Sequence, residues 1–92
     1  MTPERHQNYR AALAIIEDVG PSKLHAAERD TLLACAEDLL LSDDLALVRA
    51  QRDEALELLR RLVDSGRWLE LTARRLGARI EACGPATVIA AA

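Results

Sequence analysis

The chain has 92 residues, half of them apolar, with twelve basic and fifteen acidic side chains and two cysteines. This length fits one domain, and such a domain buries only about 60 to 65% of the surface of its unfolded chain, so association with another chain would add stability. A net charge of −3 excludes the strong positive field of general nucleic-acid-binding proteins, and the shortage of aromatic residues favours helices over strands.

No part of the sequence resembles a segment that enters or crosses a membrane. Residues 1–6 are not followed by the apolar segment of a secretory signal peptide, and no apolar run approaches the roughly twenty residues of a membrane span. We therefore expect a cytoplasmic protein with no membrane partner. Eleven arginines against one lysine, together with abundant alanine, favour a bacterial source with a GC-rich genome.

Two helices are predicted in the first half of the chain. The first begins at Pro3 with Thr2 as its cap, because proline at the first helical position costs no hydrogen bond. Its apolar stripe comprises Tyr9, Ala12, Leu13, Ile16 and Val19. The second follows Gly20-Pro21, begins between residues 22 and 24 and ends near Leu41. Its buried face comprises Leu24, Leu32, Cys35, Ala36 and Leu39.

Two further helices are predicted in the second half. The third is capped by Ser42, has Asp43 and Asp44 at its positive end, and runs to about Asp64, where Gly66 can end it. Its stripe comprises Leu45, Val48, Ala55, Leu56, Leu59 and Val63. The fourth runs from about Arg67 to Cys83. Its stripe comprises Leu69, Thr72, Ala73, Leu76, Ile80 and Cys83.

The short connections between these segments predict the architecture. Consecutive helices joined by a few residues lie antiparallel, so we predict an all-α, up-down-up-down four-helix bundle. The alternative is a three-helix core with the N-terminal helix docked across it. We assign residues 1–85 to a single helical domain and 86–92 to an apolar C-terminal tail. Because free chain ends are usually polar, Val88 and Ile89 are expected to pack on the bundle or on a second copy.

The sequence lacks the patterns of a catalytic, metal or cofactor site. The Glu-x-x-His motifs of di-metal helical bundles are missing, and His6 and His25 are interpreted as surface residues. The serines lie at predicted helix ends, where capping explains them. Cys35 and Cys83 lie on apolar stripes, so we expect buried free thiols with no disulfide and no nucleophilic role. We therefore expect no enzyme, no metal and no cofactor.

Two charged residues interrupt the apolar stripes of the second and third helices. Arg52 stands where an aliphatic residue is expected, and Glu28 does so on the second helix. In an antiparallel hairpin that turns near residue 42, the two lie about 7 Å apart along the axis, which an arginine side chain can cross. We predict a buried ion pair between Glu28 and Arg52 or an Arg52 that lies over the edge of the bundle; an anion or partner site is the alternative.

A second set of apolar residues predicts a surface for association. The predicted partner-binding residues are Leu33, Leu40, Leu47, Leu58, Leu62 and Trp68. The leucines form extra ridges on the second and third helices and would make a large apolar patch if exposed. Trp68 is either the lid of the core or an anchor for a partner. Gly77, in mid-helix, is expected to let a neighbouring helix of the bundle, or a partner chain, approach closely.

These observations predict a non-enzymatic helical protein–protein interaction module, either a homodimer or a subunit of a hetero-complex. A dimeric helical DNA-binding regulator is one alternative, since Arg67, Arg74, Arg75 and Arg79 follow the break at Ser65-Gly66. These arginines occupy two flanks of the helix and form no single recognition face, which argues against nucleic acid as a partner. A bundle that binds a small apolar ligand is the other alternative.

Overall fold

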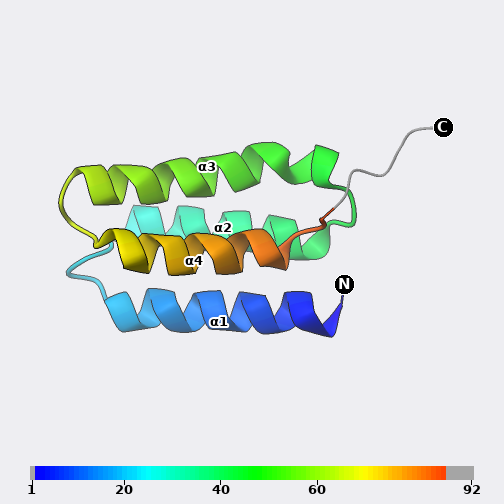
Figure 1. Ribbon diagram of the computed structural model, residues 1–92, viewed down its shortest axis with the longest axis horizontal. Helices are drawn as coiled ribbons and strands as arrows, with labels where there is room; N and C mark the ends of the chain where they lie inside the picture. The colour runs from blue at the N-terminus through cyan, green and yellow to red at the C-terminus, as the bar shows by residue number, and fades with distance from the viewer. Residues whose placement is uncertain (1, 87–92) are drawn as a thin grey trace.

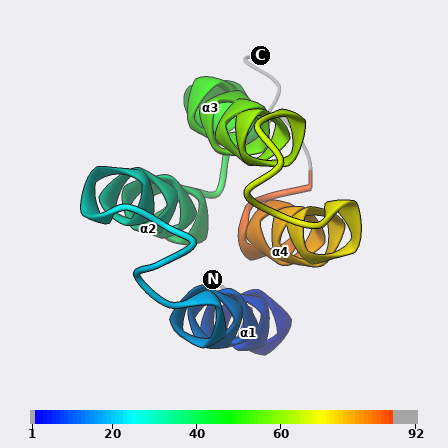
Figure 2. The same ribbon diagram turned by 90° about the vertical axis from the view of Figure 1, so that its left-hand side faces the viewer.

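The computed structural model describes residues 2–86, in which it has four α-helices: α1 (Pro3–Val19), α2 (Ala26–Leu41), α3 (Leu45–Asp64) and α4 (Glu70–Cys83). The helices run side by side, and each is antiparallel to the one before it (Figure 1). Seen end-on, α1 and α3 lie at opposite corners and do not contact each other, whereas α2 and α4 contact each other and both remaining helices (Figure 2). The predicted up-down-up-down bundle is confirmed, and the arrangement with α1 docked across three helices is wrong. Val88 and Ile89 lie outside the described residues.

The start of α1 and the end of α3 are those that the sequence predicts. The Thr2 hydroxyl accepts a hydrogen bond from the Arg5 amide at 3.2 Å, and Pro3 is the first helical residue. Helix α3 ends at Asp64, and Gly66 follows with a φ of 79°, in the left-handed region that glycine adopts without a steric penalty. Local capping chemistry is sufficient to place both ends.

The predicted start of α2 is too early. The helix begins at Ala26, because residues 21–23 form a turn and the His25 amide donates to the Glu28 carboxylate at 2.9 Å, which closes the first helical turn from that point. Leu24 therefore precedes the helix, although its side chain is buried as predicted.

The predicted start of α4 is also too early. The amides of Arg67 and Trp68 both donate to the Leu62 carbonyl at 3.1 Å and complete the end of α3, so α4 begins at Glu70. Ser42 does not cap α3 either. That position belongs to Asp44, whose carboxylate accepts from the Ala46 amide at 3.0 Å.

The core lies between the four helices. Its largest fully buried side chains are Leu24, Leu32, Leu39, Leu62, Leu76, Ile80 and Cys83. Gly77 lies in the contact between α4 and α3: a Cβ atom there would lie 3.3 Å from Leu56 Cδ2 and 3.5 Å from Leu59 Cδ1. The prediction that Gly77 admits a neighbouring helix of the bundle is confirmed.

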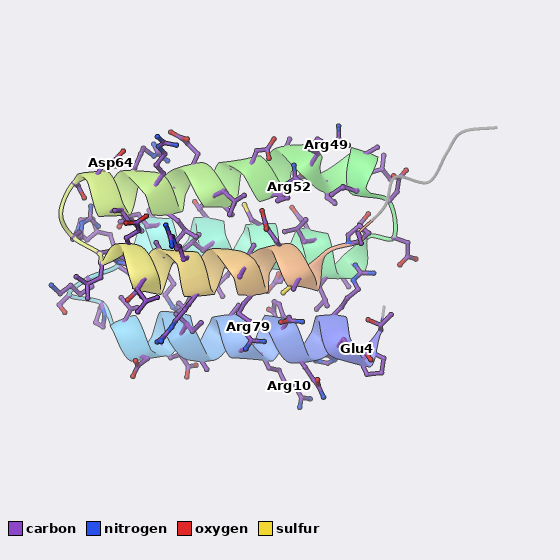
Figure 3. The ribbon with its side chains drawn as sticks, in the orientation of Figure 1. Glu4, Arg10, Arg49, Arg52, Asp64 and Arg79 are labelled. Carbon is purple, nitrogen blue, oxygen red and sulfur yellow. The ribbon has the colours of Figure 1, made fainter. Side chains whose placement is uncertain are left out.

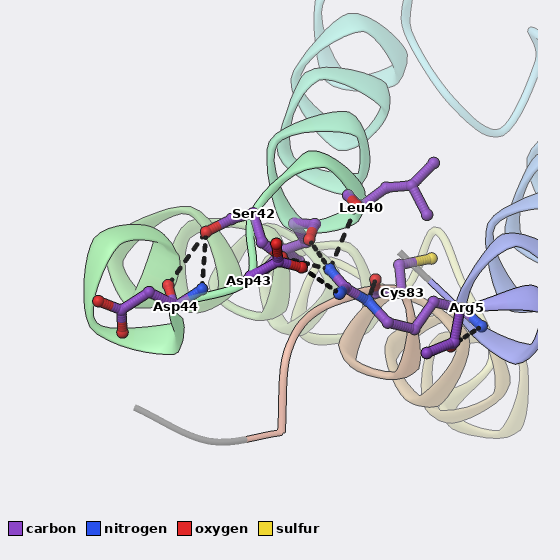
Figure 4. Close-up of polar contacts among 8 residues, drawn as sticks. Arg5, Leu40, Ser42, Asp43, Asp44 and Cys83 are labelled. Carbon is purple, nitrogen blue, oxygen red and sulfur yellow. Dashed lines mark hydrogen bonds and ion pairs between the residues drawn. The ribbon is translucent and has the colours of Figure 1, made fainter. Parts of the chain in front are cut away.

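Arg5 joins three helices at one end of the bundle (Figure 4). Its Nε donates to the Cys83 carbonyl at 2.8 Å, and its Nη2 donates to the Leu39 carbonyl at 2.8 Å, to the Leu40 carbonyl at 3.2 Å and to the Ser42 carbonyl. The side chain is only 13% exposed. The last carbonyls of a helix have no partner within it and carry partial negative charge, so one guanidinium group satisfies the ends of both α2 and α4.

Candidate functional site

The apolar surface predicted on the second and third helices is not exposed in the structure. The residues predicted to form it are Leu33, Leu40, Leu47, Leu58, Leu62 and Trp68. Four of them are buried, Leu33 is partly buried against the core, and only Leu47 is exposed, at 73%. The prediction is wrong on this point because α3 contacts both α2 and α4, so Leu58 and Leu62 of its second leucine ridge are covered.

Trp68 is the lid of the core and not a free anchor for a partner. Its side chain is 6% exposed, and the indole N–H donates to the Lys23 carbonyl at 2.7 Å. This bond ties the loop between α3 and α4 to the loop between α1 and α2. Trp68 therefore stabilises the end of the bundle opposite Arg5.

Glu28 and Arg52 do not form the predicted ion pair. Glu28 pairs with Arg67, and Arg52 pairs with its neighbour Asp53 at 3.2 Å. Because Glu28 also caps the start of α2 through the His25 amide, it is held at the end of the bundle, away from the middle of α3. Partial burial by itself would raise the pKa of Glu28, but the hydrogen bonds from Arg67 and from the His25 amide outweigh that effect and lower the pKa.

The two thiols are buried and free, as predicted. Burial raises the pKa of Cys35 to about 11, and the nearby carboxylates of Glu54 and Asp38 add to the rise. Burial also raises the pKa of Cys83 to about 11, against the opposing charge of Arg5. Both thiols are therefore protonated at neutral pH, and a protonated thiol is a poor nucleophile.

The arginines that follow Gly66 do not form one basic face. Arg67 and Arg74 are each paired with a carboxylate of this chain. Arg79 lies where α4 meets α1 and donates to the side-chain oxygen of Asn8 at 2.9 Å (Figure 3). Three of the four arginines that follow Gly66 therefore have partners within the protein.

A groove with a volume of about 780 Å³ follows the contact between α3 and α4. We call it the α3–α4 groove. Its floor consists of the apolar residues and the glycine of the lining, which are Leu56, Leu59, Val63, Ala73, Gly77 and Ala78. Leu56 and Val63 are only partly buried, and Ala78 is exposed, so apolar carbon faces solvent along the groove. Small side chains of α4 let the two helices approach along the floor, and α1 does not contact α3 on this side.

Charged side chains border the α3–α4 groove on both sides. The rim residues are the carboxylates Asp53, Glu57, Asp64, Glu70 and Glu81 and the guanidinium groups Arg60 and Arg74. Asp64 marks the rim near the C-terminal end of α3 (Figure 3). The sequence shows these residues only as ordinary solvated positions, because which flank of each helix borders a groove depends on where the neighbouring helices lie.

Within residues 2–86, no group of three or more His, Cys, Asp or Glu side chains is arranged to hold a metal ion. No helix in that range combines the length and the apolar character of a membrane span.

No protein-family model matches the chain, and neither a curated protein nor a solved structure matches it significantly. What the α3–α4 groove can do therefore follows from its own residues.

Proposed function

We propose that the protein is a non-enzymatic protein–protein interaction module that receives one helix of a partner protein in the α3–α4 groove. The observation that carries this proposal is the open apolar floor, with Leu56 and Val63 partly exposed beside the small side chains of α4. An amphipathic helix that lays its apolar face in such a groove removes that surface from water, which is a common mode of recognition between proteins.

The dimensions of the groove favour a helix over an extended segment. The part of α4 between Glu70 and Glu81 is about 16 Å long by helical rise, which corresponds to about three turns of a partner helix. Ala73, Gly77 and Ala78 are small and lie at helical spacing, so another helix can come close to the backbone of α4. A partner helix here would lie alongside α3 and α4.

The other functions that the sequence suggests have less support. A small apolar ligand needs a cavity that encloses most of its surface, whereas the α3–α4 groove is open along its length. A phosphate backbone would meet five carboxylates on the rim. We propose the cytoplasm as the place of the interaction, which the free buried cysteines support.

Selection of binding peptides against the purified protein tests the proposal. A phage library of helical peptides is screened against the immobilised protein, and each selected peptide is measured against Ala78→Gln and against Ala34→Gln. Ala78 and Ala34 are both exposed helical alanines, but only Ala78 lines the groove, so the pair keeps charge and helix context constant. We expect Ala78→Gln to weaken the selected peptides about tenfold, through lost apolar contact and poor fit, and Ala34→Gln to leave them unchanged. Selected peptides that bind both variants equally, or a screen that yields none, would contradict the proposal.

A further inference from the structure

The excess negative charge of the protein lies on the rim of the α3–α4 groove. The chain has twelve basic and fifteen acidic side chains. The lining of the groove contains two of the basic and five of the acidic side chains. The remaining surface therefore carries ten basic and ten acidic side chains and has no net charge. The negative field of the protein comes from the groove and not from its surface as a whole.

Two of the rim carboxylates form no ion pair among the described residues. Arg60 faces Asp64 at 4.0 Å, Arg74 pairs with Glu70 at 3.0 Å, and Asp53 pairs with Arg52 from outside the groove. The two remaining rim carboxylates are Glu57 of α3 and Glu81 of α4. Neither forms an ion pair within the part of the chain that the structure describes.

These free carboxylates lie on both sides of the middle of the groove. Glu57 follows Leu56, the residue that packs against Gly77, and Glu81 is one helical turn beyond Gly77. An apolar floor between two unpaired acidic positions matches a helix with an apolar stripe and basic residues on its flanks. On this basis, and resting on the proposed function, we infer that the partner is a cationic amphipathic helix of another protein, with Lys or Arg facing Glu57 and Glu81.

A second copy of this chain fits the groove less well. In a two-fold dimer the same surface faces itself, so the rim of one groove would meet the equally negative rim of the other. Like charges brought together at an interface oppose association. The charge of the groove therefore favours a different protein over a homodimer.

Three synthetic helical peptides of about 18 residues test this inference. They share one leucine–alanine stripe and differ only at the flanking positions, which are lysine, glutamine or glutamate. Binding is measured by fluorescence anisotropy at low and at moderate salt. We expect the lysine peptide to bind about tenfold more tightly than the glutamine peptide, the glutamate peptide to bind most weakly, and the preference for lysine to shrink as salt screens the charges.

A matched pair of charge reversals locates the effect. The double variant Glu57→Lys with Glu81→Lys should weaken the lysine peptide about tenfold and improve the glutamate peptide. The control, Glu17→Lys with Asp30→Lys, makes the same change in net charge at exposed positions outside the groove. It should change the affinity for the lysine peptide and for the glutamate peptide by no more than about twofold.

The outcomes separate this inference from the proposed function. If the glutamine peptide binds as tightly as the lysine peptide and Ala78→Gln weakens both, the groove receives helices without regard to charge, and only this inference fails. If the lysine peptide binds Ala78→Gln and Ala34→Gln equally, it binds elsewhere, and the proposed function fails with it. If light scattering shows a dimer that Ala78→Gln dissociates, a second copy is the occupant and the inference is overturned.

Discussion

The Arg5 end of the bundle and the α3–α4 groove use charge in opposite ways. All three guanidinium nitrogens of Arg5 donate to oxygens of this chain, and the side chain is largely enclosed. In the groove, Glu57 and Glu81 have no ion pair among the described residues and lie beside exposed apolar carbon. A charge whose hydrogen bonds are satisfied inside the fold stabilises it, whereas unpaired charges around an open apolar floor remain free for a partner.

Removal of the Arg5 guanidinium group should have the largest effect on stability. The variant Arg5→Met keeps much of the aliphatic stem but leaves the terminal carbonyls of α2 and α4 without their donor, which should cost about 3 kcal/mol of unfolding free energy. The measurement is urea denaturation followed by circular dichroism. The control is Arg10→Met on the same helix, where the side chain points away from the other helices (Figure 3) and the change should be within about 0.5 kcal/mol. Equal losses in the two variants would show that Arg5 is an ordinary surface residue.

The buried thiols provide a second measure of how firmly the Arg5 end is closed. Because the pKa of Cys35 and Cys83 is raised to about 11 in the fold, the stability that their protonated state contributes is fully present below pH 9.0 and is lost as the pH rises toward 11. Urea titrations at pH 8 and pH 10.5 should show that loss. At pH 8, native thiol labelling should be about a hundredfold slower than labelling in urea, and rapid native labelling of Cys83 would show that this end opens freely.

Glu28 is a paired carboxylate and can be compared directly with the unpaired Glu57. Glu28→Gln should lose on the order of 1 kcal/mol at pH 7, because it weakens the bond to Arg67 and the capping bond from the His25 amide. Since the pKa of Glu28 is lowered in the fold, the stability it contributes is present above its ordinary pKa of 4.5 and is lost as the pH falls through the lower folded value. The difference between the wild type and Glu28→Gln should therefore shrink below pH 4.5. A difference independent of pH would exclude an ionic contribution.

The smallest effect on stability is expected in the groove. Glu57→Gln and Glu81→Gln remove unpaired, exposed carboxylates, so each should change the unfolding free energy by less than about 0.5 kcal/mol, and the loss of mutual repulsion can make the change slightly stabilising. Thermal denaturation of the two variants beside Glu28→Gln provides the comparison. A loss as large as that of Glu28→Gln would mean that these carboxylates have structural partners and are not free for a ligand.

Local chemistry allowed much of the fold to be predicted. The Thr2 cap, the Pro3 start and the Gly66 stop depend on neighbours a few residues away, and all three are as predicted. Spacing alone is a weaker guide for surface ion pairs: Glu70 pairs with Arg74 four residues on, whereas Glu57 does not pair with Arg61 at the same spacing. The error at the start of α4 arose because the Leu62 carbonyl of α3 takes the amides that precede α4, whereas the start of α2 is set by the turn at residues 21–23 and the capping bond to Glu28.

The role of Arg5 and the location of the groove depend on contacts between distant segments. Arg5 lies in the first turn of a helix, where a cation is locally unfavourable, and its acceptors are 34 to 78 residues away. Leu58 and Leu56 are equally apolar, yet Leu58 is buried and Leu56 borders the groove. The positions of α2 and α4 around α3 determine that Leu58 is buried and that Leu56 is left at the groove.

The position of a bound cationic helix tests the central claim most directly. The lysine-flanked peptide is titrated into isotopically labelled protein, and the backbone amide shifts are followed by nuclear magnetic resonance. We expect the largest changes at Leu56, Val63, Ala73, Gly77 and Ala78, with the amides of Glu57 and Glu81 moving in the same titration. Changes centred on α2, or on the exposed leucines Leu41 and Leu47 at the α2–α3 turn, would contradict the assignment of the α3–α4 groove as the binding surface.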